Sequence, residues 1–386
     1  MDFSLPDELH QLRASLRHFI GDELLPRERE SRFDEDTELP QKLMDWARKR
    51  AVELGFYGML MPREVGGGGL GHVGMVVLKE EIGRSGSYLG QLVLGDAGGP
   101  SRLLVECSDH VHQSYLLPSM RAEKISCFAL SEPNAGSDAA SIETTAVRDG
   151  DSYVLNGTKH MVSHGAHADY AIVFAVTNKA LRARGGISCF LVDMDSPGLR
   201  ITRRHRPMGG FTEPVEIVFE DCAVPASHLV GPEGFGFVMA MRWLADGRLA
   251  MAATAVGTAE LLLQSSTNHA NRSSQSTRAR SERSSIRNML AEMATELYAA
   301  RGMLYDTAWR ADNGMDMHRE CSMTKLFATE MVNRAADAAL QIHGAASFES
   351  GCLVERIFRD VRAMRIGEGT SEIHRMIIAK SLLRET

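Results

Sequence analysis

The spacing of apolar residues changes twice along this 386-residue chain, and these two changes constrain the fold more than any other feature. In the first third, Leu9, Leu12 and Leu16 recur at helical spacing. From about Ile125 the pattern becomes a series of short, β-branched runs separated by Asp-Gly, Asn-Gly and Gly-Gly pairs. Helical spacing returns after Gly231. The order is therefore helices, strands, helices.

This order predicts a mainly α-helical protein with a central β domain. We expect an N-terminal α-helical domain over residues 1–122, a middle β-barrel or β-sandwich domain over 123–231, and a C-terminal four-helix bundle over 232–386. In the last part, residues such as Leu290 and Leu297 recur at the spacing of an amphipathic helix. A chain of this length can bury a large core.

Charge and cysteine usage narrow the function class. The formal net charge of -7 argues against nucleic acid as a partner. The six cysteines form no C-x-x-C pair, and His160, His164, His167 and His343 show no metal-ligand spacing, so we expect no bound metal and no disulfide framework. No apolar run reaches membrane-spanning length and the N-terminus lacks a signal-peptide pattern. We expect a cytoplasmic protein without a membrane partner.

A single carboxylate near the C-terminus has the setting of a catalytic base. In the run RIGEGTSEIHR, Glu368 stands between Gly367 and Gly369, which leave room for a substrate beside the backbone. Thr370 can cap the apolar helical segment that follows, and Glu372 falls in its first turn. An acidic residue at a helix start commonly serves only the helix dipole, so the interpretation needs a second motif.

The second motif is FALSEPNAGSD, which begins at Phe128 and is followed by NGTK at Asn156. With PREVGGGGLG near the start and QIHG near the end, these segments resemble the acyl-CoA dehydrogenase family in sequence and in order. The resemblance spans nearly the whole chain. It implies the same order of helical domain, β domain and helical bundle.

The resemblance implies an FAD-dependent dehydrogenation of an acyl-CoA thioester to a trans-2-enoyl-CoA. Glu368 then removes the α-proton while the flavin N5 atom accepts the β-hydrogen as hydride. Some family branches carry the base before an Arg in the first long helix of the bundle, where this chain has Gly247, so the base is assigned to Glu368. We expect burial to raise its pKa above the ordinary value of about 4.3.

The resemblance also implies which residues of the subunit bind FAD. They are Phe128, Leu130, Ser131, Gly136, Ser137, Met161, Ser163, Thr370 and Glu372. Met161 replaces a common Trp, and because a thioether donates no hydrogen bond we expect a looser flavin wall. The serines can instead serve as turn residues, and Thr370 and Glu372 as helix caps.

Four residues are expected near the substrate: Ser137, Arg248, Gly367 and Gly369. Gly367 stands where the family often has Tyr, which predicts a wider pocket for a bulky, branched or ring-bearing acyl group. Arg248 matches a residue that approaches CoA or substrate. A buried helix–helix ion pair is the alternative for Arg248, and the sequence leaves both open.

Family members form tetramers in which a neighbouring subunit holds the pyrophosphate and adenine end of FAD, so we expect a homotetramer or a dimer. Gln341 and Gly344 match that half of the site, whereas Ala345 replaces a Gly. Ser273 and Ser276 replace an Arg and a Phe within an Arg/Ser-rich segment. Arginines of that segment can substitute as phosphate partners, or the segment is a solvated loop. These departures predict weaker FAD binding.

The family usually passes its electrons to an electron-transferring flavoprotein, which is the expected partner. A flavin oxidase of the same fold, in which dioxygen takes the electrons, is one alternative. A noncatalytic flavoprotein that binds nucleic acid through the Arg/Ser-rich segment is another, and the net acidity and the intact base argue against it.

Overall fold

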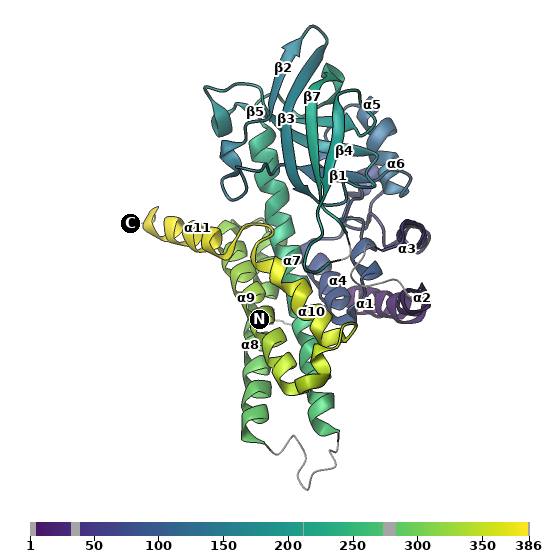
Figure 1. The fold of residues 1–386 in the computed structure, drawn as a ribbon, viewed down its shortest axis with the longest axis vertical. Helices are drawn as coiled ribbons and strands as arrows, with labels where there is room; N and C mark the ends of the chain where they lie inside the picture. The colour runs from purple at the N-terminus through teal and green to yellow at the C-terminus, as the bar shows by residue number, and fades with distance from the viewer. Residues whose placement is uncertain (1–4, 32–38, 211, 273–282, 385–386) are drawn as a thin grey trace.

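The computed structural model describes residues 5–31, 39–210, 212–272 and 283–384. Helices, strands and then helices follow one another, so the predicted fold class is confirmed (Figure 1). The domain boundaries after residues 122 and 231 stay a prediction. In the described part, no helix is long and apolar enough to cross a membrane. Ser273 and Ser276 lie outside the described residues.

The N-terminal part is helical, as predicted. Its α-helices are α1 (Asp7–Phe19), α2 (Leu25–Ser31), α3 (Gln41–Glu53), α4 (His72–Ser85), α5 (Asp109–Val111) and α6 (Leu117–Met120). Helix α4 is buried on most of its circumference, including Val76, Val77 and Leu78. Because most of its surface is buried, α4 lies inside the core, where it packs against α1 and against the later helices α7 (Gly236–Asn271) and α8 (Ser284–Asp312).

The middle part forms one sheet in which eight strands are described. These are β1 (Ser126–Ala129), β2 (Thr145–Asp149), β3 (Ser152–Val162), β4 (Tyr170–Val176), β5 (Ile187–Asp193), β6 (Leu199–Arg204), β7 (Val215–Pro225) and β8 (Leu229–Val230). Their order is β6-β7-β3-β2-β4-β5-β8, with β1 paired to β4. The β1/β4 and β2/β4 pairs are parallel and the other pairs are antiparallel.

Strand β4 shows how both faces of the sheet are covered. All of its residues are buried. Because side chains alternate between faces, Ile172 packs in a cluster that includes Ala240 of the first long helix, whereas Val173 packs with Ile217 and Phe219 of β7. The strand therefore joins a helix-covered face to a closed strand-on-strand core, as expected for a barrel or sandwich.

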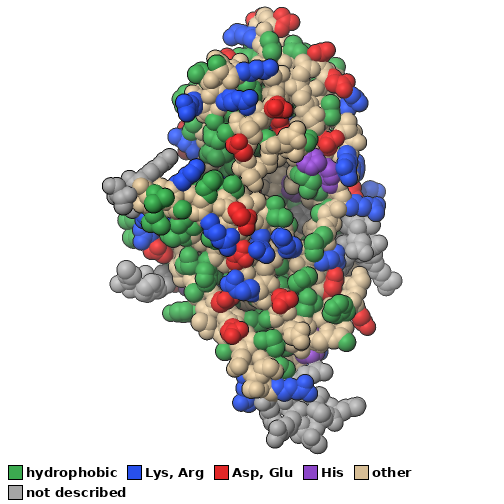
Figure 2. Space-filling view, turned by 60° about the vertical axis from the view of Figure 1, so that its left-hand side comes forward, with side chains coloured by type: hydrophobic (Ala, Val, Ile, Leu, Met, Phe, Trp, Pro, Cys, Tyr) green, Lys and Arg blue, Asp and Glu red, His purple; other side chains and the backbone are tan. Residues whose placement is uncertain are grey.

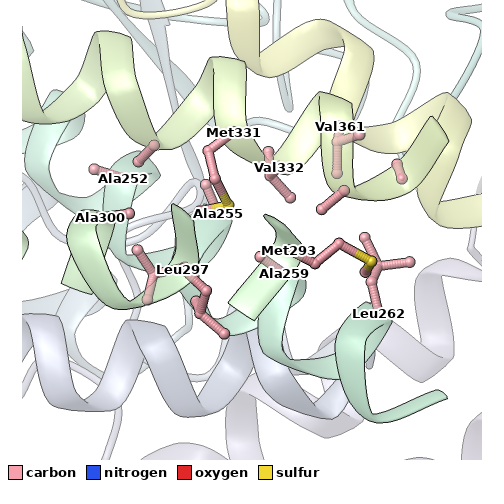
Figure 3. Packing of buried hydrophobic residues seen from close by; sticks show 14 of the residues in the cluster. Ala252, Ala255, Ala259, Leu262, Met293, Leu297, Ala300, Met331, Val332 and Val361 are labelled. Carbon is pink, nitrogen blue, oxygen red and sulfur yellow. The ribbon is translucent and has the colours of Figure 1, made fainter. Parts of the chain in front are cut away.

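The C-terminal part consists of long helices. They are α7 (Gly236–Asn271), α8 (Ser284–Asp312), α9 (His318–His343), α10 (Leu353–Arg362) and α11 (Ser371–Arg384). Small and large apolar residues interdigitate in their core (Figure 3), among them Ala255 of α7, Leu297 of α8, Met331 of α9 and Val361 of α10. Helix α11 packs on α9 and projects from the bundle (Figure 1).

Two glycines bring the backbones of α4 and α7 into contact. A Cβ atom on Gly257 would lie 1.9 Å from the carbonyl oxygen of Glu80, and one on Gly83 would lie 2.2 Å from that of Thr254. Only glycine permits so close an approach. The crossing holds α7, whose N-terminal half runs toward the β domain (Figure 1), against the N-terminal helices.

Candidate active site

The loop between α10 and α11 places Glu368 in a strained turn. Its φ angle is +56° and that of Gly369 is +97°. A non-glycine residue adopts this left-handed region rarely. Helix α11 begins only at Ser371, and the turn directs the Glu368 side chain toward α7, as the following contact shows.

The Glu368 carboxylate fills the space that Gly247 leaves open. An ideal Cβ on Gly247 would lie 2.8 Å from the Oε2 atom of Glu368. That Oε2 atom is buried and has no hydrogen-bond partner. Burial raises the pKa of Glu368 to about 7, although the charges of Arg248 and Lys325 oppose this shift. Positions 247 and 368, which are far apart in the sequence, therefore lie next to each other in the folded chain.

Two buried cations hold the backbone of this turn. The Arg248 Nε atom donates to the Glu368 carbonyl at 3.2 Å, and the Lys325 Nζ atom donates to the Gly369 carbonyl at 2.7 Å. Their exposed fractions are 6% and 0%, so water cannot replace these bonds. Burial lowers the pKa of Lys325 to about 8, against the opposite influence of Glu368. In the part of the chain that the structure describes, Arg248 therefore contacts the Glu368 turn through a backbone carbonyl.

An aromatic pair joins the β domain to the helix that contacts Glu368. Phe128 of β1 stacks on Trp243 of α7 with ring centroids 4.0 Å apart and planes 9° from parallel. Trp243 precedes Gly247 by four residues, so the two lie on the same face of α7. The predicted flavin residue Phe128 is thereby brought toward Glu368. Figure 2 shows a hollow in the surface between the strand-rich and the helical parts.

Sequence similarity decides the family once this geometry is known. The chain matches three profiles: "Acyl-CoA dehydrogenase, N-terminal domain" over residues 6–123, "middle domain" over 127–222 and "C-terminal domain" over 234–383. It belongs to the acyl-CoA dehydrogenase family. The protein is therefore an oxidoreductase of an FAD-binding family, as predicted.

Individual relatives agree with this family assignment. The chain is 36% identical over 386 residues to the "Probable acyl-CoA dehydrogenase YngJ" of Bacillus subtilis, covering 100% of both chains. It is 34% identical over 383 residues to the "Caffeyl-CoA reductase-Etf complex subunit CarC" of Acetobacterium woodii, covering 98% of this chain and 99% of that one. The structure of butyryl-CoA dehydrogenase from Megasphaera elsdenii matches with a TM-score of 0.90 at 29% identity, covering 100% of both chains.

The β domain and the Glu368 loop carry groups that fit a flat, amphipathic ring. Met161 is 48% exposed at the end of β3 and Ile366 is 58% exposed beside the base, although both are apolar. Ser131 and Ser163 add hydroxyl groups to the same strand ends, where the Ser131 carbonyl accepts the His160 N–H at 2.8 Å. These residues suit the amphipathic ring of FAD. Gly136 and Ser137 lie in the exposed turn that follows β1.

The glutamate of the Ser-Glu-Pro motif supports this turn. Glu132 forms a buried salt bridge of 2.7 Å with Lys159 and accepts the N–H groups of Glu143 and Thr144 at 2.6 and 2.9 Å. The Lys159 Nζ atom also donates to the carbonyl of Leu130 at 3.0 Å. The motif thus fixes its own loop, a role that the sequence did not reveal.

Thr370 and Glu372, which follow Glu368, differ in their surroundings. The Thr370 hydroxyl accepts the N–H of Ile373 at 3.3 Å, so the expected capping bond is present. Glu372 is exposed and lies 3.6 Å from Arg375.

The proposed partner half of the FAD site lies away from the base. Gln341, Gly344 and Ala345 are exposed where α9 ends. Lys325 lies 16 residues earlier on the same helix, so Gln341 is about 24 Å from it along the axis. A single chain does not bring these residues to Glu368, as expected if they serve a neighbouring subunit.

Proposed function

We propose that this protein catalyses FAD-dependent α,β-dehydrogenation of an acyl-CoA, with Glu368 as the base that removes the α-proton. The observation that supports this most strongly is the Glu368 carboxylate, whose Oε2 atom is buried without a hydrogen-bond partner and whose pKa is raised to about 7. A carboxylate in this state is far more basic than one in water, and a general base works best when its pKa lies near the working pH. Bound FAD supplies the hydride acceptor.

The remaining residues position this chemistry. Arg248 and Lys325 fix the Glu368 turn through its two carbonyls, so the base does not shift when its charge changes. We propose that the following residues bind FAD: Phe128, Leu130, Ser131, Gly136, Ser137, Met161, Ser163, Thr370 and Glu372. We assign the thioester region to Ser137, Arg248, Gly367 and Gly369.

The acyl pocket is less open at Gly367 than the sequence alone suggests. A Cβ there would lie 3.2 Å from the terminal methyl carbon of Met251, so a thioether already occupies part of the space. A Met side chain adapts readily to different neighbours. We therefore keep a branched or ring-bearing acyl group as the proposed substrate class, and Met251 as the residue that moves to admit it.

The reverse reaction, reduction of an enoyl-CoA to an acyl-CoA, is a second candidate function. The chain resembles a subunit named for caffeyl-CoA reductase, which acts on an unsaturated thioester. With a pKa of about 7, Glu368 can donate a proton to the α-carbon as well as remove one. An electron-transferring flavoprotein is the proposed redox partner in either direction, and a homotetramer or dimer the proposed assembly, with Gln341, Gly344 and Ala345 completing a neighbour's FAD site.

An anaerobic substrate screen tests the proposed function. FAD-loaded protein is mixed with straight-chain, branched and aryl acyl-CoAs, and the flavin absorbance is followed. We expect at least one compound to bleach the flavin. If none does so and enoyl-CoAs do not reoxidise the chemically reduced enzyme, the proposal fails. Peroxide release in air would identify the oxidase alternative instead.

The rate of dehydrogenation should depend on pH through Glu368. Because burial raises the pKa of this acid to about 7, the active carboxylate form is lost as the pH falls through 7. We expect kcat/KM, which reports the substrate-free enzyme, to fall about tenfold per pH unit below pH 6 and to level off above pH 8. Stopped-flow reduction of the flavin between pH 5 and 9 measures this. A rate that is constant across this range would contradict the assignment.

Replacing Lys325 should shift the pH dependence of flavin reduction. The Lys325 charge opposes the raised pKa of Glu368, so its loss in Lys325→Met should shift the acidic limb to higher pH. At pH 7 we expect flavin reduction roughly five- to tenfold slower, with recovery at high pH. Lys380→Met, on the exposed face of α11, is the control and should leave the midpoint unchanged. A lower rate at every pH would instead indicate a purely structural role for Lys325.

A further inference from the structure

A second group of chemically versatile side chains lies in the β domain. His160, His205 and Glu216 each offer one ligand atom, and these atoms lie within 4.8 Å of one another. The Nδ1 atom of His160 is 3.3 Å from the Oε2 atom of Glu216. The rings of His160 and His205 meet edge to face with centroids 4.6 Å apart. Histidine spacing in the sequence did not reveal the group, because its members come from different segments.

The sheet is irregular on both sides of Glu216, and these irregularities create the group. On β3, the two residues between Lys159 and Val162 face Glu216 alone, which places His160 in a β-bulge. On the other neighbour, β6, Thr202 is an extra residue opposite β7. A bulge re-aims side chains and occurs often beside functional sites. Two bulges that flank one carboxylate indicate a built arrangement.

Outer contacts orient the possible ligands. The Thr202 hydroxyl donates to the Oε1 atom of Glu216 at 2.8 Å, which leaves the Oε2 atom directed to His160. The Nε2 atom of His205 is buried and has no hydrogen-bond partner. A buried polar atom without a partner is unfavourable.

We propose that His160, His205 and Glu216 form a site for a divalent transition-metal ion, of which Zn²⁺ fits best. Two imidazoles and one carboxylate are a common donor set for Zn²⁺, with water as the fourth ligand. Bonds of about 2.0–2.1 Å in tetrahedral geometry separate two ligand atoms by about 3.3 Å. The measured separation between His160 and Glu216 matches this. The ligand atom of His205 lies within 4.8 Å of the other two and must move closer to them to share the ion.

The position of the site suggests its role. His205 begins the connection from β6 to β7, which reaches the bundle at α10. There Arg359 donates to the carbonyl of Met208 at 3.1 Å, and the Gly210 N–H donates to Asp360 at 2.7 Å. A metal ion at the base of this connection therefore stiffens the contact between the β domain and the bundle. The role is structural and independent of Glu368.

Equilibrium dialysis of FAD-loaded, chelator-treated protein against Zn²⁺ tests the proposal. We expect about one bound ion per chain, with affinity at least tenfold weaker in His205→Ala and in Glu216→Gln. His18→Ala removes an exposed histidine that lies 2.6 Å from Asp22 and should bind Zn²⁺ as the unaltered protein does. Bound flavin, measured in each variant, verifies that the fold is retained.

Thermal unfolding provides an independent readout. Zn²⁺ should raise the midpoint of the unaltered protein and of His18→Ala, and should leave that of Glu216→Gln unchanged. The proposal is overturned if the unaltered protein binds no stoichiometric Zn²⁺, or if all variants bind it equally. In that case the group is an ordinary ion pair between His160 and Glu216.

Discussion

Glu368→Gln should abolish substrate oxidation while the flavin remains bound. Glutamine keeps the shape of the side chain beside Gly247 but cannot accept the α-proton. Loss of a general base typically slows a reaction by about 10²–10⁴-fold. We expect the upper end because position 247, where some family branches carry the base, is a glycine in this chain. Anaerobic stopped-flow reduction of the flavin measures the effect.

Two comparisons make this result specific. Glu292→Gln, at an exposed carboxylate of α8, should reduce the flavin at nearly the normal rate. Since the folded state raises the pKa of Glu368, it binds the proton more tightly than the unfolded state, and stability falls as the pH rises from about 4.5 to 7. Glu368→Gln should therefore be more thermostable than the unaltered protein at pH 8, a difference that fades toward pH 4.5. Normal turnover by this variant would refute the assigned base.

The second large effect is expected far from the base, at the glycine contact between α4 and α7. Gly257→Ala would place a methyl group 1.9 Å from the Glu80 carbonyl oxygen, which belongs to backbone and cannot rotate away. The two helices must separate, and overpacking of this kind costs about 3 kcal/mol or more. We expect a clearly lower thermal midpoint and loss of protein during expression.

Gly302→Ala is the matched control. Gly302 also lies inside a long helix, α8, but a Cβ there meets no atom within 4 Å. Alanine is a better helix former, so this change should be neutral or should stabilise by roughly 0.5–1 kcal/mol. A lower thermal midpoint in Gly257→Ala together with an equal or higher one in Gly302→Ala would show that the close approach of the helices, rather than helix propensity, determines the effect. Equal midpoints would contradict the described crossing.

Much of the fold was predictable because the spacing of apolar residues differs between helices and strands. The change of spacing near Ile125 and again after Gly231 matches the start and end of the strands. The family motifs then indicated Glu368 as the proposed base, since two glycines around a carboxylate before a helix are a local signal. The burial of Glu368 and the resulting rise of its pKa agree with the expectation.

The supporting contacts could not be read from the sequence because they join distant segments. Lys325 occupies a buried position among apolar residues of α9, and only the folded chain shows that it meets Gly369. Trp243 is one of several large residues on α7 until β1 brings Phe128 against it. Likewise, the bulges that gather His160 and Glu216 depend on strand register, which periodicity does not specify.

The charge balance around the Glu368 turn has one further consequence. Arg248 and Lys325 contribute two positive charges and Glu368 one negative charge, so these groups sum to +1 when all are ionised. Transfer of a proton to Glu368 raises the sum to +2 in surroundings that hold little water. Such a change favours a bound species that becomes more negative at the same moment, and it favours a neutral species less. Return of the proton to solvent is therefore expected to accompany resetting of the enzyme for the next substrate.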